Sequence, residues 1–281
     1  MAKRKGVCWM CVRPGPLTEE HAFPDWIREI FARDGNDIAL SDHRAGVTER
    51  SRTWTNTSGE IVVRSVCGAC NHGWMSGLEG HCKPILGPLI HGRRARFEPD
   101  AQAVLALWAV KTAWVFQSTN PTTSTCTADQ RHALATAHAV PDGIRVLLGG
   151  YDEAGGKVLC ASWYTAGSTT AEAGRLDASA ATLVIGRAVL QVLQRPPGDG
   201  PSGPPAQQSP PATAALRRLL PPTGQPIDWP PLPPLRHGDL DGFVKPPGFT
   251  ARPWASLPPL SAPPAPEPTD TPANPGANDR R

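Results

Sequence analysis

Two Cys-x-x-Cys pairs set the strongest constraint on how this chain folds. The first pair is Cys8 and Cys11, and the second is Cys67 and Cys70. Four thiolates arranged as two such turns can surround one ion, so these four residues are predicted to form a closed tetrahedral zinc site. Because 55 residues lie between Cys11 and Cys67, more than a compact zinc finger contains, a small domain must be inserted between the pairs.

A redox function is the main alternative for a Cys-x-x-Cys pair. Redox pairs normally accompany a thioredoxin-like βαβ pattern, which this sequence lacks. Residues 1–5 lead directly into Gly6 and not into an apolar segment, so no signal peptide is expected. A cytoplasmic protein with reduced thiols follows, and this favours metal binding. The remaining cysteines, Cys82, Cys126 and Cys160, are expected to be small buried hydrophobic residues.

Proline divides the chain into a folded part and a Pro-rich part. Of the 33 Pro residues, 25 follow Arg195. Because proline lacks a backbone donor and such segments bury little apolar area, residues 196–281 are predicted to be a largely disordered linker and tail. Within the tail, residues 225–254 carry apolar side chains and are the part expected to pack back on the folded region.

The sequence predicts an α+β protein with several units. These are a basic arm at 1–7, a zinc domain at 8–95, a small α+β unit of unassigned role at 100–193, and the tail. The expected elements are helices at 25–32, 71–79, 101–117 and 128–140, a strand at 61–66, a hairpin of 143–151 with 157–164, an ambiguous apolar segment at 182–193, and a loop or insertion at 34–59. The most apolar stretch, Val104 to Phe116, is too short to span a membrane, so no membrane association is predicted.

The charge is distributed unevenly. Residues 1–97 hold 14 Lys and Arg against 10 Asp and Glu, whereas the whole chain has a net charge of only +3. The basic excess therefore lies around the cysteine pairs. It is compatible with a polyanion partner, and equally with a solvated surface.

Residues between and beside the cysteine pairs add chemistry to the predicted metal site. Glu20-His21 is followed by Pro24, and Asn71 follows the second pair directly. This order resembles the HNH endonuclease family, in which a ββα-metal fold, often stapled by zinc in a treble-clef-like arrangement, cuts nucleic-acid phosphodiesters. The residues that carry the resemblance are Cys8, Cys11, Glu20, His21, Pro24, Cys67, Cys70 and Asn71. The resemblance covers roughly residues 8–80.

The resemblance implies a function for three side chains. His21 would be the general base that deprotonates the attacking water, since imidazole titrates near neutral pH. Glu20 and Asn71 would be the ligands of a catalytic Mg²⁺ or Mn²⁺ ion, because hard divalent ions prefer oxygen ligands and stabilise charge on phosphate. The partner would be nucleic acid, with DNA expected.

Several alternatives stay open. The family's middle Asn has no counterpart in residues 61–63, although Asn56 could replace it, and this gap favours a non-catalytic zinc module that binds nucleic acid or a protein. Asn71 could instead cap the helix that follows. Residues 230–236 resemble a polyproline ligand with a flanking Arg. His132 and His138 belong to no motif and are expected on the surface.

Overall fold

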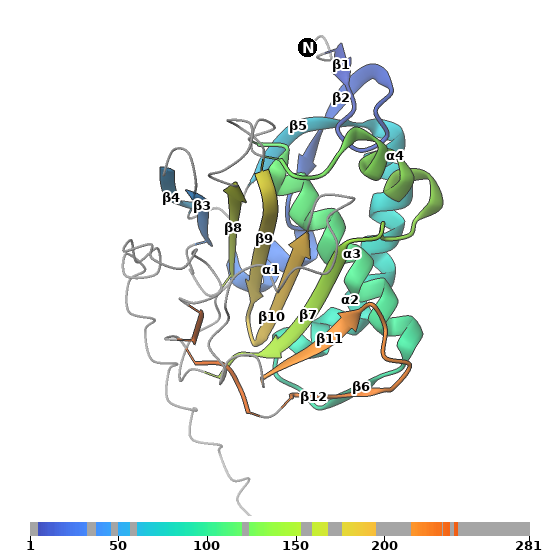
Figure 1. The fold of residues 1–281 in the computed structure, drawn as a ribbon. Coiled ribbons are helices and arrows are strands. Elements are labelled where there is room, and N and C mark those ends of the chain that lie inside the picture. Colours follow the sequence, from blue (N-terminus) through green and yellow to red (C-terminus); the bar gives the residue numbers. More distant parts are fainter. Residues whose placement is uncertain are drawn as a thin grey trace, which may run out of the picture.

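The chain combines three β-sheets with helices in a mixed α+β fold, as the sequence predicts (Figure 1). A computed structural model describes residues 5–32, 38–45, 50–56, 61–119, 124–152, 159–167, 176–194, 215–231, 233–236 and 239–240. The sheets contain seven, three and two strands. In the N-terminal region the four cysteines of the two Cys-x-x-Cys pairs lie close together.

The seven-stranded sheet draws its strands from both halves of the chain. Its order is β11-β7-β10-β9-β8-β3-β4. The strands are β3 (Ile38–Ala45), β4 (Arg50–Asn56), β7 (Ile144–Gly150), β8 (Leu159–Gly167), β9 (Leu176–Ile185), β10 (Ala188–Gln194) and β11 (Leu216–Leu220). Every neighbouring pair is antiparallel except β3 with β8, which is parallel. All seven residues of β10 are buried, so this strand lies in the interior of the protein.

Two of the predicted elements are corrected by this sheet. The expected hairpin of residues 143–151 with 157–164 is wrong, because β10 and β9 lie between β7 and β8. The ambiguous segment at 182–193 supplies those inserted strands, as most of the β9–β10 hairpin. Of the loop or insertion expected at 34–59, the loop is wrong, since the segment contains the β3–β4 hairpin. No local sequence signal indicates that the distant strand β8 pairs with β3.

Helices pack beside the sheets at the positions that their sequences favour. α1 (Asp25–Ala32) matches its predicted range, and α3 (Pro99–Gln117) is buried along most of its length as its apolar sequence predicts. α4 (Ala128–Ala137) begins with a capping box, in which Thr127 and Gln130 bond each other's backbone N–H groups. Among the described residues, no helix has both the length and the apolar character needed to cross a membrane.

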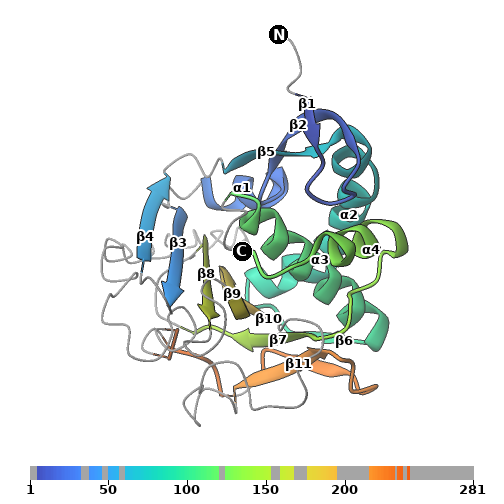
Figure 2. The same ribbon diagram turned by 45° about the horizontal axis from the view of Figure 1, so that its top comes forward.

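The cysteine region is built from a small sheet followed by a kinked helix (Figure 2). β1 (Lys5–Val7), β2 (Pro14–His21) and β5 (Val62–Cys67) form the antiparallel three-stranded sheet. A π-helical turn, η1 (Cys70–Met75), comes next and continues as α2 (Ser76–Ile90) after a kink at Gly73. Strand β5, which pairs with β2, therefore leads directly into this helix.

One hydrophobic core extends from the cysteine region to the C-terminal strands. It includes Met10, Phe23, Trp108, Leu190 and Trp229, so it is continuous across residues 95–100, where the sequence suggested a boundary. A close contact at Gly186 helps to hold these parts together. Gly186 has φ +58, and a Cβ there would lie 2.5 Å from the Ile90 carbonyl oxygen at the end of α2. Only glycine combines that conformation with that approach.

The described part of the Pro-rich region is folded onto the rest of the protein. β12 (Ile227–Trp229) pairs with β6 (Ala95–Phe97), and β11 joins the large sheet. Leu235 is fully buried, and its backbone N–H donates to the Gly150 carbonyl at 2.6 Å. The interpretation of residues 230–236 as a free polyproline ligand is therefore wrong. Residues 195–214 and 241–281 lie outside the described residues.

Candidate metal centre and the residues around it

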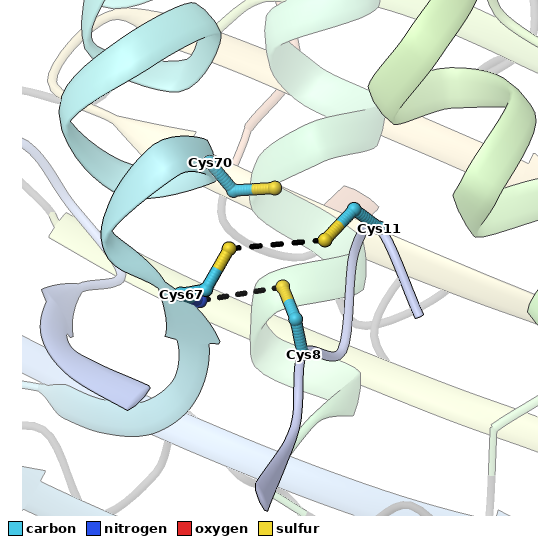
Figure 3. Close-up of side chains that lie close together, drawn as sticks. All are labelled: Cys8, Cys11, Cys67 and Cys70. Carbon is cyan, nitrogen blue, oxygen red and sulfur yellow. Dashed lines mark hydrogen bonds between the residues drawn. The ribbon is translucent and has the colours of Figure 1, made fainter. Parts of the chain in front are cut away.

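The four cysteines of the two pairs converge on one point (Figure 3). Their sulfur atoms all lie within 4.8 Å of one another, and the Sγ atoms of Cys11 and Cys67 are 3.7 Å apart. A tetrahedral ion bound by thiolates at about 2.3 Å separates its sulfurs by roughly 3.8 Å. The cluster could therefore hold a metal ion with little movement.

The backbone of the first pair forms a tight turn that aims both sulfurs inward. The Cys8 N–H donates to the Arg13 carbonyl, and the Val12 N–H donates to the Cys8 carbonyl. Val12 adopts φ +60, which closes the turn after Cys11. The second pair lies where β5 meets the helix, and the Cys67 N–H donates to the Cys8 sulfur at 3.3 Å. A backbone donor of this kind stabilises negative charge on sulfur.

Hydrogen bonding within the cluster favours the thiolate form of Cys8. The pKa of Cys8 is lowered from 9.0 to about 4, chiefly because Cys70 donates a hydrogen bond to its sulfur, although burial opposes this effect. Because Cys70 is the donor in this hydrogen bond, the same bond raises the pKa of Cys70. A cation among the four sulfurs would stabilise the thiolate form of each.

Helix α4 covers the outer side of the first cysteine turn, a contact that no sequence motif indicates. Arg131 donates from Nε to the Trp9 carbonyl at 2.7 Å, and its guanidinium lies 3.8 Å from the centre of the Trp9 ring. His132 Nδ1 lies 2.9 Å from the Cys11 carbonyl oxygen. His132 is exposed as expected, yet it contacts the backbone of a candidate metal ligand.

Trp74 lies on the other side of the cluster. Its indole N–H is buried and has no hydrogen-bond acceptor among the described residues. The pKa of the nearby Cys70 thiol, raised mainly by its bond to Cys8 and by burial, is partly lowered again by this indole. His138, from the end of α4, stacks on the Trp74 ring with 5.4 Å between ring centres. Trp74 thus places a buried N–H donor near the sulfur of a candidate metal ligand.

Replacing Arg131 with alanine is expected to weaken metal binding by about 10- to 100-fold, the usual effect of removing a group that orients a metal ligand. Arg131 holds the backbone of the Cys8–Cys11 turn through Trp9, so its loss lets the turn move. Competition with a colorimetric chelator measures the affinity. Arg145→Ala, which removes an exposed arginine from β7, is the matched control and should leave the affinity unchanged.

His21 lies at the end of β2, and its side chain is 35% exposed. Its Nδ1 is 3.8 Å from a carboxylate oxygen of Asp25 in the first turn of α1, and Asp25 also binds Arg28 at 2.6 Å. The Ala22 N–H donates to the Ile61 carbonyl at 2.9 Å and fixes the backbone just beyond the histidine. The imidazole is therefore accessible and beside an acidic group.

Asn71 lies beside the same strand. Its side-chain N–H group donates to the Glu19 carbonyl at 2.7 Å and to the Thr18 hydroxyl at 3.2 Å. The structure thus brings Asn71 to the backbone two residues before His21. The Asn71 side chain does not cap the helix, because no side-chain capping hydrogen bond is present at the start of η1. Asn71 ties the first helical turn to β2.

Glu20 points in the opposite direction from His21, into the core. Glu20 is 5% exposed, and its carboxylate lies 3.8 Å from the ammonium of Lys111 on α3. That ammonium binds Glu79 more closely, at 2.6 Å. Burial raises the pKa of Glu20 to about 7, while Lys111 lowers it and Glu79 raises it further. The carboxylate predicted to bind a catalytic ion is therefore in contact with a buried amine.

The raised pKa of Glu20 predicts a pH effect on stability. Between its ordinary pKa of 4.5 and about 7 the folded protein keeps this carboxyl protonated while the unfolded chain releases the proton. Folding then takes up a proton, so the contribution of Glu20 to stability falls as pH rises through this window. Relative to wild type, Glu20→Gln should gain up to roughly 3 kcal/mol in unfolding free energy between pH 5 and pH 8.

Urea unfolding at pH 5, 6, 7 and 8 measures this difference. Glu19→Gln is the matched control, since Glu19 is the preceding residue and pairs with Arg64 at the surface. Its effect should stay below about 1 kcal/mol at every pH. A Glu20→Gln difference that stays constant from pH 5 to pH 8 would contradict the assignment.

Comparisons of the chain with protein-family models, with curated proteins and with solved structures found no match.

Proposed function

We propose that this protein hydrolyses phosphodiester bonds in nucleic acid as an HNH-type endonuclease, with DNA as the expected substrate. Its general base would be His21, and the four cysteines would hold a structural zinc ion. One observation carries the proposal. Next to the cysteine cluster, β5 pairs with β2 and leads into a helical turn, where Asn71 binds the Glu19 carbonyl on β2, two residues before the accessible His21.

Zinc is the ion that the cysteine cluster suits best. Four thiolates in two Cys-x-x-Cys turns form the usual closed, tetrahedral structural zinc site, which leaves no position open for substrate. In this proposal zinc holds the turn after β1 against the start of the helix. It does not take part in the hydrolysis.

His21 has the surroundings that a general base needs. Its ring is accessible, and the Asp25 carboxylate near Nδ1 would stabilise the positive charge that the ring acquires when it takes a proton from water. Asn71 would act by holding the strand backbone beside His21. That positioning function is the one that the family's middle Asn normally performs.

The predicted ligands of a catalytic Mg²⁺ or Mn²⁺ ion do not fit that function in this structure. The Glu20 carboxylate is buried and contacts Lys111, and Asn71 is bound through its amide N–H group to β2. A divalent ion supplies charge stabilisation at phosphate in this family. This arrangement of Glu20 favours the second candidate, a non-catalytic zinc module that binds nucleic acid or a protein.

Plasmid nicking separates the two candidates. Purified protein containing one zinc per chain is incubated with supercoiled DNA, with Mg²⁺, with Mn²⁺, or with no added ion. A chelator is avoided because it would also remove zinc. Conversion to nicked circles supports the endonuclease. If neither ion gives nicking but DNA is retained in a salt-dependent way, the protein is a nucleic-acid-binding module.

A further inference from the structure

A fully buried lysine joins the strand that carries His21 to two helices. The Lys111 side chain is 0% exposed, and its ammonium lies 2.6 Å from Glu79 and 3.8 Å from Glu20. A buried ammonium is stable only when it is paired with negative charge. Since the two carboxylates come from α2 and β2, this one cation connects α3 to both elements.

The connection is made at Glu20, the residue before His21. Successive side chains of a strand point to opposite faces, so Glu20 reaches the core while His21 reaches the surface. Along the backbone, Asn71 binds the Glu19 carbonyl two residues before His21, and the Ala22 N–H binds the Ile61 carbonyl one residue beyond it. The Glu20–Lys111 contact is therefore the inner member of a set of contacts that fix this backbone.

We propose that Lys111 is a positioning residue for His21, and that its ammonium, in place of a divalent ion, is the cation bound by Glu20. The positioning of His21 by Lys111 rests on the proposed function, because it concerns the orientation of the general base. The second part explains why Glu20 does not fit as a metal ligand: its buried carboxyl group already lies against an ammonium, which Glu79 also binds. A hydrated Mg²⁺ ion with its several waters would require that contact to open.

The first test measures hydrogen exchange at the end of β2 in the full-length, zinc-bound protein. Lys111→Met alone would leave two carboxylates without a cation, so the variant to use is Lys111→Met with Glu20→Gln, in which Glu79 keeps some solvent contact. The peptide containing residues 19–23 should exchange at least about tenfold faster than in wild type, with the peptide containing residues 67–70 unchanged. Lys83→Met, an exposed lysine on α2, is the control. Unchanged exchange at residues 19–23 would overturn the positioning function.

The second test needs no lysine substitution. Mn²⁺ is titrated into wild type and Glu20→Gln, and paramagnetic broadening of the backbone amide signals of residues 19–22 is recorded. The same broadening is expected in both proteins. Broadening centred on Glu20 in wild type that disappears in Glu20→Gln would show that Glu20 binds the ion, and would overturn the inference.

Cleavage assays add a third readout. For an active enzyme, the double variant should have a lower kcat with an unchanged KM for DNA, because the base is misaligned while substrate binding is intact. Lys111→Arg, which keeps the charge, should recover part of kcat. If wild type does not cleave DNA at all, the proposed function fails, whereas exchange and Mn²⁺ broadening still decide what Lys111 does.

Discussion

Replacing Cys70 with alanine is expected to abolish metal binding and to unfold the region around the cysteine cluster. Structural zinc contributes an apparent binding free energy of about 10–16 kcal/mol in small zinc-finger peptides. That is as large as the whole stability of a typical domain, about 5–15 kcal/mol. Because the cluster shares one core with the large sheet, the thermal transition of the entire protein should be lost or shifted down by more than 10 °C.

Metal content by mass spectrometry and thermal melting by circular dichroism test this result together. Wild type should contain one zinc per chain, and Cys70→Ala should contain none. Cys126→Ala is the matched control, since Cys126 is a buried free cysteine outside the cluster. It should keep one zinc and lose only a small part of the stability. A Cys70→Ala protein with full zinc content and the wild-type melting temperature would exclude the predicted site.

Replacing His21 with alanine is expected to slow DNA cleavage by about 10²- to 10⁴-fold, the usual contribution of a general base. In the proposed reaction the loss would appear in kcat, because the imidazole would act on water in the transition state and would not hold the DNA. The side chain is partly exposed, so the fold and the zinc content should be retained.

The control for this substitution is His81→Ala. His81 is an exposed histidine on α2 whose ring contacts the Gly77 carbonyl of its own helix at 2.8 Å. Cleavage rates are compared by plasmid nicking under the ion condition that gives the highest wild-type activity. Equal rates for wild type and His21→Ala would show that another group is the base, or that the nicking comes from a contaminant.

The cysteine cluster and several helices could be predicted from sequence because their signals are local. A Cys-x-x-Cys turn already fixes the spacing of two sulfurs, and α1 shows its apolar face within eight residues. The inward direction of Glu20 depends instead on Lys111, a residue 91 positions later that sits in an otherwise apolar helix. A motif comparison assigns such a carboxylate to a metal, because it takes no account of a distant amine.

The contacts around the cysteine cluster could not be predicted from the sequence for a related reason. Arg131 and His132 bind backbone carbonyl groups of Trp9 and Cys11, and a carbonyl group has no sequence signature. In the same way, β3 pairs with β8, which lies more than 100 residues further along the chain. Long-range pairing of this kind outweighs the local preference for a loop.

The parallel pairing of β3 with β8 also constrains how the protein folds during synthesis. β3 follows β2 in the sequence and precedes the second cysteine pair, yet its partner comprises residues 159–167. When Cys70 leaves the ribosome, the metal can bind, but the β3–β4 hairpin has no sheet to join until β8 has also emerged. We expect the nascent chain to expose the edge of β3 during that interval, and an unpaired strand edge favours aggregation.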